Sequence, residues 1–281
     1  MKTWKKIVLG VSLISLFLGG GLVAWGYSQG GLTDLQNQTK SEQDYVKKEV
    51  KDFNKIDIKS SSYNVLIKNG EVDKATLSYY QKTKNPIDTS VKDGQLTIND
   101  NNSELDSTSN KHINFFGLKD LVRLSTLNKE VRNKTIVITL PKKQTIDSLK
   151  VDLATGNLDL SNSTIKQADI NLNVGDLTFT KMIVSNLKAN LDVGSVDSDH
   201  TLFTNSDLSI AMGDYSGDNM IFNGHNKLDV TSGDIEIVLK DYTLNVQADS
   251  HSGEGDITNN LKISKDNTLT ITSDLGDITV E

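Results

Sequence analysis

The chain has 281 residues, 36% of them hydrophobic and 24% charged, which is enough to bury the core of one or two domains. It has no cysteine, which excludes disulfides, thiolate metal sites and a cysteine nucleophile. Residues 1–147 carry 22 Lys and Arg against 16 Asp and Glu, whereas residues 148–281 carry 8 Lys, no Arg and 21 Asp and Glu. Because this acidic half would repel a phosphate backbone, we expect no nucleic-acid partner. A solvated acidic surface explains the surplus better than a specific cation-binding face.

Residues 1–27 predict cytoplasmic lysines followed by a single transmembrane anchor. Three lysines precede an uncharged stretch, of which residues 7–27 would span about 31 Å as a helix, close to the thickness of bilayer hydrocarbon. The lysines favour a cytoplasmic N-terminus, with the bulk of the chain outside the cell membrane. A cleaved signal peptide, with its site near residues 24–26, is the alternative, and it exports the rest of the chain equally.

Residues 28–52 are predicted to form a polar tether that contains a short helix. Ser41 is a candidate N-cap, and Val46, Val50 and Phe53 fall on one helical face. We expect this helix to pack on the end of the domain that follows rather than on a membrane, because its apolar stripe is narrow.

From residue 53 onward the pattern becomes the alternation of apolar and polar residues that is typical of strands, so residues 53–281 are interpreted as one extracytoplasmic β-repeat domain. Residues 99–133 interrupt it and are interpreted as a long loop or insertion. The insertion contains the chain's only two arginines, and aromatic residues and arginines frequently anchor interfaces. Its candidate interaction residues are Phe115, Phe116, Arg123 and Arg132. A short buried helix is the more conservative interpretation of its apolar part.

The most regular repeat occupies residues 148–281 and is marked by glycines. Their separations are 19, 19, 19, 20, 22 and 21 residues. An alternating strand precedes each glycine and a shorter one follows it. This period of about 20 predicts an all-β, β-helix-like solenoid of stacked coils, in which each coil completes its core only with its neighbours. The glycines are Gly156, Gly175, Gly194, Gly213, Gly233, Gly255 and Gly276.

Each of these glycines is interpreted as a structural turn. Glycine adopts a positive φ at little cost, and the residue that follows it is usually an aspartate, whose side chain can accept a hydrogen bond from an amide of the turn. Stacked carboxylates could also bind calcium. The known calcium-binding β-roll phrase, however, repeats every nine residues and contains more glycine. We therefore expect structural corners, with no metal and no cofactor.

The phrases FNKIDIKSSSYNVLIKNG, VKDGQLTIND and IVITLPKKQTIDSLKVDLATGNLDL, followed by serial Gly-Asp turns, resemble the bacterial putative-adhesin (toast-rack) family of β-strand repeats. That family includes the Lia-type envelope-stress proteins of Gram-positive bacteria. The resemblance covers residues 53–281. It implies a long solenoid-like domain outside the membrane and offers no catalytic residues to carry over.

No established catalytic motif is present. The four histidines, His112, His200, His225 and His251, have neither metal-ligand spacing nor the spacing of the repeat, so they are interpreted as surface residues. No nucleophile elbow or phosphate-binding loop occurs. The sequence thus predicts a non-catalytic, membrane-anchored protein with a binding or scaffold role in adhesion or envelope stress. Its expected partner is an envelope protein, a wall polymer or an antimicrobial ligand. A carbohydrate-active enzyme on a β-solenoid is the alternative.

Overall fold

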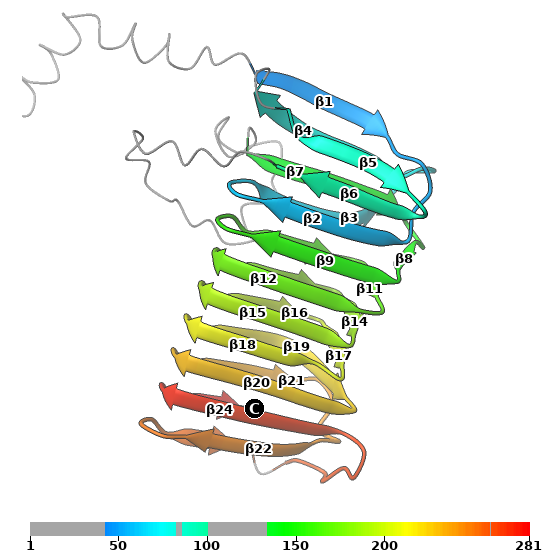
Figure 1. Cartoon of the computed structure of the whole chain (residues 1–281). Coiled ribbons are helices and arrows are strands. Elements are labelled where there is room, and N and C mark those ends of the chain that lie inside the picture. The colour runs from blue at the N-terminus through cyan, green and yellow to red at the C-terminus, as the bar shows by residue number, and fades with distance from the viewer. Residues whose placement is uncertain (1–42, 83–85, 101–133, 259) are drawn as a thin grey trace, which may run out of the picture. The chain divides into compact units, whose positions relative to one another are not determined.

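The structure is a computed structural model, and it describes residues 43–82, 86–100, 134–258 and 260–281 (Figure 1). Within these ranges every regular element is a β-strand, as the predicted all-β class requires. No helix in the described part of the chain is long and apolar enough to cross a bilayer. The predicted anchor, most of the tether and the candidate residues of the insertion lie outside the described residues. Residues 44–281 form one compact unit.

The strands stack as coils with three faces, and Figure 1 shows the regular succession of β9, β12, β15, β18 and β20 along the stack. Face A contains β10 (Leu158–Ser161), β13 (Leu177–Thr180), β16 (Val196–Asp199), β19 (Tyr215–Asn223), β21 (Ile235–Leu239), β23 (Gly255–Ile257) and β25 (Ile278–Val280). Face B contains β9 (Ser148–Leu153), β12 (Ala168–Val174), β15 (Leu187–Val193), β18 (Asp207–Met212), β20 (His225–Ser232), β22 (Asn245–Ser250) and β24 (Thr268–Leu275). Face C contains β8 (Thr145–Ile146), β11 (Thr164–Ile165), β14 (Ile183–Ser185) and β17 (Leu202–Thr204).

The N-terminal part extends faces A and B with less regular pairings. Its strands are β1 (Gln43–Glu49), β2 (Lys55–Ser60), β3 (Asn64–Gly70), β4 (Thr76–Lys82), β5 (Asp88–Lys92), β6 (Gln95–Asn99) and β7 (Thr135–Pro141). Strand β2 joins β9 on face B and β3 joins β10 on face A, both in parallel. The pairs β4–β7 and β5–β6 are antiparallel, so this end of the stack is closed by a different strand arrangement.

The regular coils pair in parallel and in register at a spacing of 19 residues. On face A, Leu158 pairs with Leu177 and Leu177 pairs with Val196. Since equivalent residues lie side by side, inward side chains form continuous rows of buried apolar groups. Between faces A and C, Phe179 packs edge-on against Phe203 with ring centroids 5.1 Å apart. Within face C, Phe203 is the register partner of Phe222, at the end of β19, and their ring centroids are 6.1 Å apart. The inward side chains of each inner coil are therefore covered by the two neighbouring coils, as expected for a solenoid.

The helix predicted near residues 41–53 is wrong, because residues 43–49 form strand β1. This strand lies beside β4 at the edge of its sheet. The rings of Tyr45 and Tyr80 lie 4.9 Å apart, and Val46 packs against the core. Tyrosine and valine favour strands, and pairing with an open sheet edge outweighs the weak helical pattern. The expectation that this segment packs on the domain does hold for Val50 and Phe53, which are buried.

Six of the described coils turn from face B to face A at a glycine with a strongly positive φ. Gly194 has φ of 148°, a conformation that side-chain-bearing residues rarely adopt. A Cβ at Gly194 would also overlap the carbonyl oxygen of Gly175 in the preceding coil. Glycine is thus required both by the backbone conformation and by the close approach of successive coils. Six of the seven predicted corners have φ between 141° and 149°, namely Gly156, Gly175, Gly194, Gly213, Gly233 and Gly276.

The residue after the corner glycine ties each coil to the next one. The side chain of Asp176 accepts a hydrogen bond from the amide of Ser195 at 3.1 Å, and Ser195 Oγ accepts one from the amide of Asp214 at 3.2 Å. Asp214 and Asp234 continue the series, each accepting from the corresponding amide of the next coil at 2.9 Å. The expectation that these side chains bond within their own turn is therefore corrected, because the amide belongs to the neighbouring coil.

The corner predicted at Gly255 is also wrong. A Cβ at Gly276 would overlap the carbonyl of Gly233, and one at Gly253 would overlap that of Gly276, so the coil containing Gly253 is the last. Strand β24 accordingly lies between β20 and β22. The inner positions of β24, Leu269, Ile271 and Ser273, are buried, whereas β22 is partly exposed and suits the end of the stack. Spacing along the sequence could not reveal this order, because both coils have similar lengths.

We predict that Gly194→Val destabilises the protein by at least about 1–3 kcal/mol, the strain expected for a side chain held at this φ. The overlap with Gly175 adds to that strain. The matched control is Gly255→Val, because a Cβ at Gly255 meets no atom within 4 Å. Chemical unfolding of both variants checks this, and equal midpoints for Gly194→Val and the wild type would contradict the corner geometry.

Candidate functional site

Side chains fill the interior of the coils, so a binding site formed by the described residues has to lie on the outside. A cavity of about 10 Å³ lies between Leu187, Phe203 and Leu228, among other residues. This volume holds about one water molecule and no ligand. The candidate sites are therefore three features outside the apolar core: a carboxylate–histidine cluster, a buried aspartate on face A, and the edge along the glycine corners.

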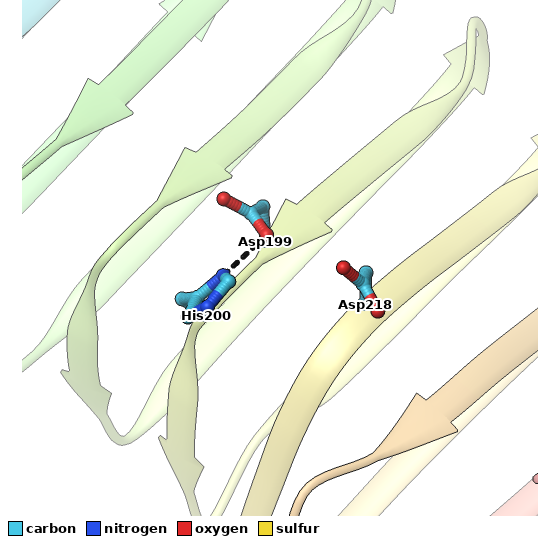
Figure 2. A group of neighbouring side chains, drawn as sticks. All are labelled: Asp199, His200 and Asp218. Atoms are coloured by element: carbon cyan, nitrogen blue, oxygen red, sulfur yellow. Dashed lines mark hydrogen bonds and ion pairs between the residues drawn. The ribbon is translucent and has the colours of Figure 1, made fainter.

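The carboxylate–histidine cluster lies where face A turns toward face C (Figure 2). Asp199 and Asp218 are register partners in β16 and β19, so their carboxylates come from successive coils. His200 follows Asp199 with φ of 50°, and its Nδ1 lies 2.6 Å from Asp199 Oδ1. One ligand atom from each of the three residues lies within 4.8 Å of the others. Two carboxylates and an imidazole are a donor set that could hold a divalent metal ion.

The side chains of the cluster also have interaction partners without a metal ion. His200 supplies a positive charge beside Asp199 when it is protonated, and Asp218 accepts a hydrogen bond from Asn219 at 3.0 Å. Both members of the His200–Asp199 pair are nearly half exposed, so the pair contributes little to stability. The other described histidines lie elsewhere. His225 is 3.1 Å from the hydroxyl of Thr268, and His251 is 3.7 Å from Asp274.

Asp159 is a second unusual group, because it occupies an outward position of face A and yet is buried. It stands in a row with Leu66 and Thr178, which are buried as well. Its Oδ2 atom has no hydrogen-bond partner among the residues that the structure describes. The pKa of Asp159 is raised to about 7, mainly by burial, with a smaller contribution from the nearby carboxylates of Asp176 and Asp197 and an opposing one from the hydrogen bond with Thr178. The sequence alone does not reveal this group, because nothing in the strand pattern distinguishes Asp159 from the exposed aspartates.

The corner edge is the third feature, and it consists of two parallel rows beside the glycine corners. The apolar row contains Val193, Met212 and Leu275. The acidic row lies two residues further along each coil and, in the last coils, contains the exposed carboxylates of Asp214, Asp234, Asp277 and Glu254. We call these two rows together the corner edge.

Face B carries one row of charges that is balanced, unlike the corner edge. Successive register partners along its outer side alternate in sign. Opposite charges on neighbouring strands stabilise the sheet and leave little net charge along this row. The alternating row is Asp57, Lys150, Asp169, Lys188, Asp207 and Lys227.

The sequence-derived interaction residues are not tested by this geometry. Phe115, Phe116, Arg123 and Arg132 lie outside the described residues. The glycines, in contrast, are placed as coil corners with the exception of Gly255. The carboxylate–histidine cluster was missed, although the spacing of 19 residues between Asp199 and Asp218 equals the repeat and could have revealed it.

We predict that Asp159→Asn makes the protein more stable than the wild type above pH 7. The raised pKa means that the folded state holds the proton more tightly than the unfolded state does. The contribution of Asp159 to wild-type stability is therefore fully present below about pH 4, the unfolded pKa, and is lost as the pH rises through about 7, the folded pKa. Urea unfolding at several pH values, with Glu236→Gln as an exposed control on face A, measures the effect. If the free energies of unfolding of the wild type and Asp159→Asn changed in parallel with pH, the prediction would be contradicted.

Comparison with known proteins gives the family but no established activity. No curated protein sequence matches the chain. Among solved structures, similar ones include a putative cell adhesion protein from Clostridium sporogenes, with 15% identity, a TM-score of 0.34 and coverage of 85% of this chain and 99% of that chain. A putative adhesin from Bacteroides fragilis has 16% identity, a TM-score of 0.35 and coverage of 86% and 98%. A putative lipid binding protein from Parabacteroides distasonis has 10% identity, a TM-score of 0.39 and coverage of 85% and 98%.

These structural similarities are too low to carry a function to this chain. The family match is extensive, however, because the Toastrack DUF4097 family covers residues 53–281. This confirms the family resemblance that the repeat phrases indicate. The chain belongs to the Toastrack DUF4097 family.

Proposed function

We propose that this protein is a non-catalytic binding or scaffold protein of the cell envelope. In this proposal, residues 1–27 anchor it in the cytoplasmic membrane and the β-repeat domain lies outside the cell. The observation that carries the proposal is the corner edge, where exposed apolar and acidic side chains recur in successive coils. Extended surfaces of this kind are what stacked-repeat proteins use to bind partners.

The physical basis for binding is the combination of exposed apolar area with unbalanced charge. Met212 and Leu275 are more than half exposed, and carboxylates flank them along the edge. Apolar contacts supply affinity when they are desolvated, while the charges select the partner and guide its approach. A partner that covers the edge would remove this apolar surface from water.

An enzyme remains the second candidate because of Asp159. A carboxyl group with a pKa of about 7 can act as a general acid near neutral pH, and further carboxylates lie nearby. In the structure, however, Asp159 is covered, and a hydrolase would need access for its substrate. Binding at the exposed corner edge is therefore the better-supported function.

The proposal predicts that a membrane-impermeant crosslinker, added to wall-stripped cells that produce the full chain, joins it to a discrete envelope component. The repeat domain should also be digested by added protease, because it lies outside. Purified protein incubated with wall polysaccharides should release neither reducing ends nor unsaturated products. Product release that disappears in Asp159→Asn would establish the enzyme instead, and the absence of any crosslinked species would contradict a binding role.

A further inference from the structure

We propose that the corner edge binds a basic, amphipathic α-helix of a partner protein, which lies lengthwise along the stack of coils. This inference rests on the proposed binding role and names the partner's chemistry. It follows from three properties of the edge: an exposed apolar row, an acidic row beside it, and the spacing between coils.

The apolar row follows the register of the coils, with Ser232 between Met212 and Leu275. Val193 pairs with Met212 across β15 and β18, Met212 pairs with Ser232, and Ser232 pairs with Leu275 of β24. The exposed fractions are 39% for Val193, 59% for Met212 and 57% for Leu275. Three of the seven exposed large hydrophobic side chains in the described part of the chain thus lie in one row. The small Ser232 leaves space between two larger neighbours.

The acidic row gives the edge its charge preference. Asp214, Asp234 and Asp277 each use Oδ1 to accept an amide of the next coil at 2.9 Å, and the amide bonded to Asp277 is that of Glu254. None of these four carboxylates forms an ion pair with a lysine or histidine of the described residues. Their charges therefore repel one another at the spacing of the coils. A partner with lysine or arginine side chains would relieve this repulsion.

The spacing of the rows favours a helix over an extended strand. Successive coils lie about 4.8 Å apart, which is close to the 5.4 Å rise of one helical turn. Residues on one face of an extended strand recur at about 6.7 Å, so they would soon fall out of step with the coils. Three coil steps from Val193 to Leu275 span about 14 Å, the length of about ten helical residues. An apolar stripe at every third or fourth residue would follow the row, with basic residues beside it.

Other occupants fit the edge less well. An anionic membrane surface would be repelled by the acidic row. In a dimer with a twofold axis, the acidic rows of both copies would lie in one interface and repel each other. A basic amphipathic helix matches the apolar row and the acidic row together.

The test uses the full chain in phosphatidylcholine nanodiscs and a fluorescent 18-residue peptide of leucine and lysine with helical amphipathic spacing. Binding is measured by anisotropy, with empty nanodiscs subtracted, and helix formation by circular dichroism. Two control peptides have the same composition in scrambled order, or glutamate in place of lysine. We expect salt-sensitive binding and induced helicity for the first peptide alone.

Two double variants locate the site. Asp214→Asn with Asp234→Asn removes charge but keeps the oxygen that accepts the amide, as the natural Asn157 does for the amide of Asp176 at 3.0 Å. Met212→Ser with Leu275→Ser removes the apolar row. Each should weaken peptide binding by about tenfold or more, while thermal melts stay near that of the wild type. The controls Glu236→Gln on face A and Ile183→Ser on face C, both at exposed residues, should leave binding unchanged.

No binding of the leucine–lysine peptide, equal binding of the scrambled or glutamate peptide, or full binding by both double variants would overturn the inference. The outcome is separable from the broader proposal. If a chain carrying all four substitutions still forms the crosslinked species on wall-stripped cells, the binding role stands and the corner edge is not its site. Loss of that species in this chain, with the control variants unaffected, supports both.

Discussion

The close approach of successive corner glycines is the constraint on which the rest of this structure depends. From Gly175 onward, each corner glycine lies against the carbonyl oxygen of the equivalent glycine one coil earlier, so that a Cβ at Gly194 would overlap Gly175. This approach keeps successive coils in register, which aligns the inward apolar residues into rows and allows the side chain after the glycine to reach the amide of the next coil. The Gly-Asp phrase recurs because the same contact is made at each coil.

The same corner also determines what the surface presents. The aspartate that accepts the neighbouring amide has to stand at the outside of the turn, so a structural bond places its charge on the surface. The residue before the glycine is turned outward as well, which exposes Met212 and Leu275. Asparagine or serine can make the structural bond without a charge, as Asn157 and Ser195 do. Aspartate at Asp214, Asp234 and Asp277 is therefore not required by the bond alone, and this is consistent with a role in selecting a partner.

Sequence reasoning identified what depends on periodicity and missed what depends on contacts between distant segments. The repeat of apolar residues and glycines predicted the all-β coils and their length. The order of the last coils could not be predicted, because Gly233 can be followed equally well by the coil of Gly253 or that of Gly276. Strand β1 was mistaken for a helix because its pairing with β4 is a tertiary contact. Likewise, the burial of Asp159 depends on which positions share a face, and composition does not contain that information. The meeting of Asp199 with Asp218, in contrast, follows from the 19-residue repeat and was overlooked.

Amide hydrogen exchange at the corners tests the central claim most directly. The amides of Ser195, Asp214 and Asp234 lie at the partly or fully exposed edge of the coils, yet each donates to a side chain of the preceding coil. If these bonds tie the coils together, the three amides exchange as slowly as the strand amide of Val196, because all of them open only when the coils separate. Exchange of the corner amides as fast as that of the exposed residues Asp241 and Tyr242 would contradict the account.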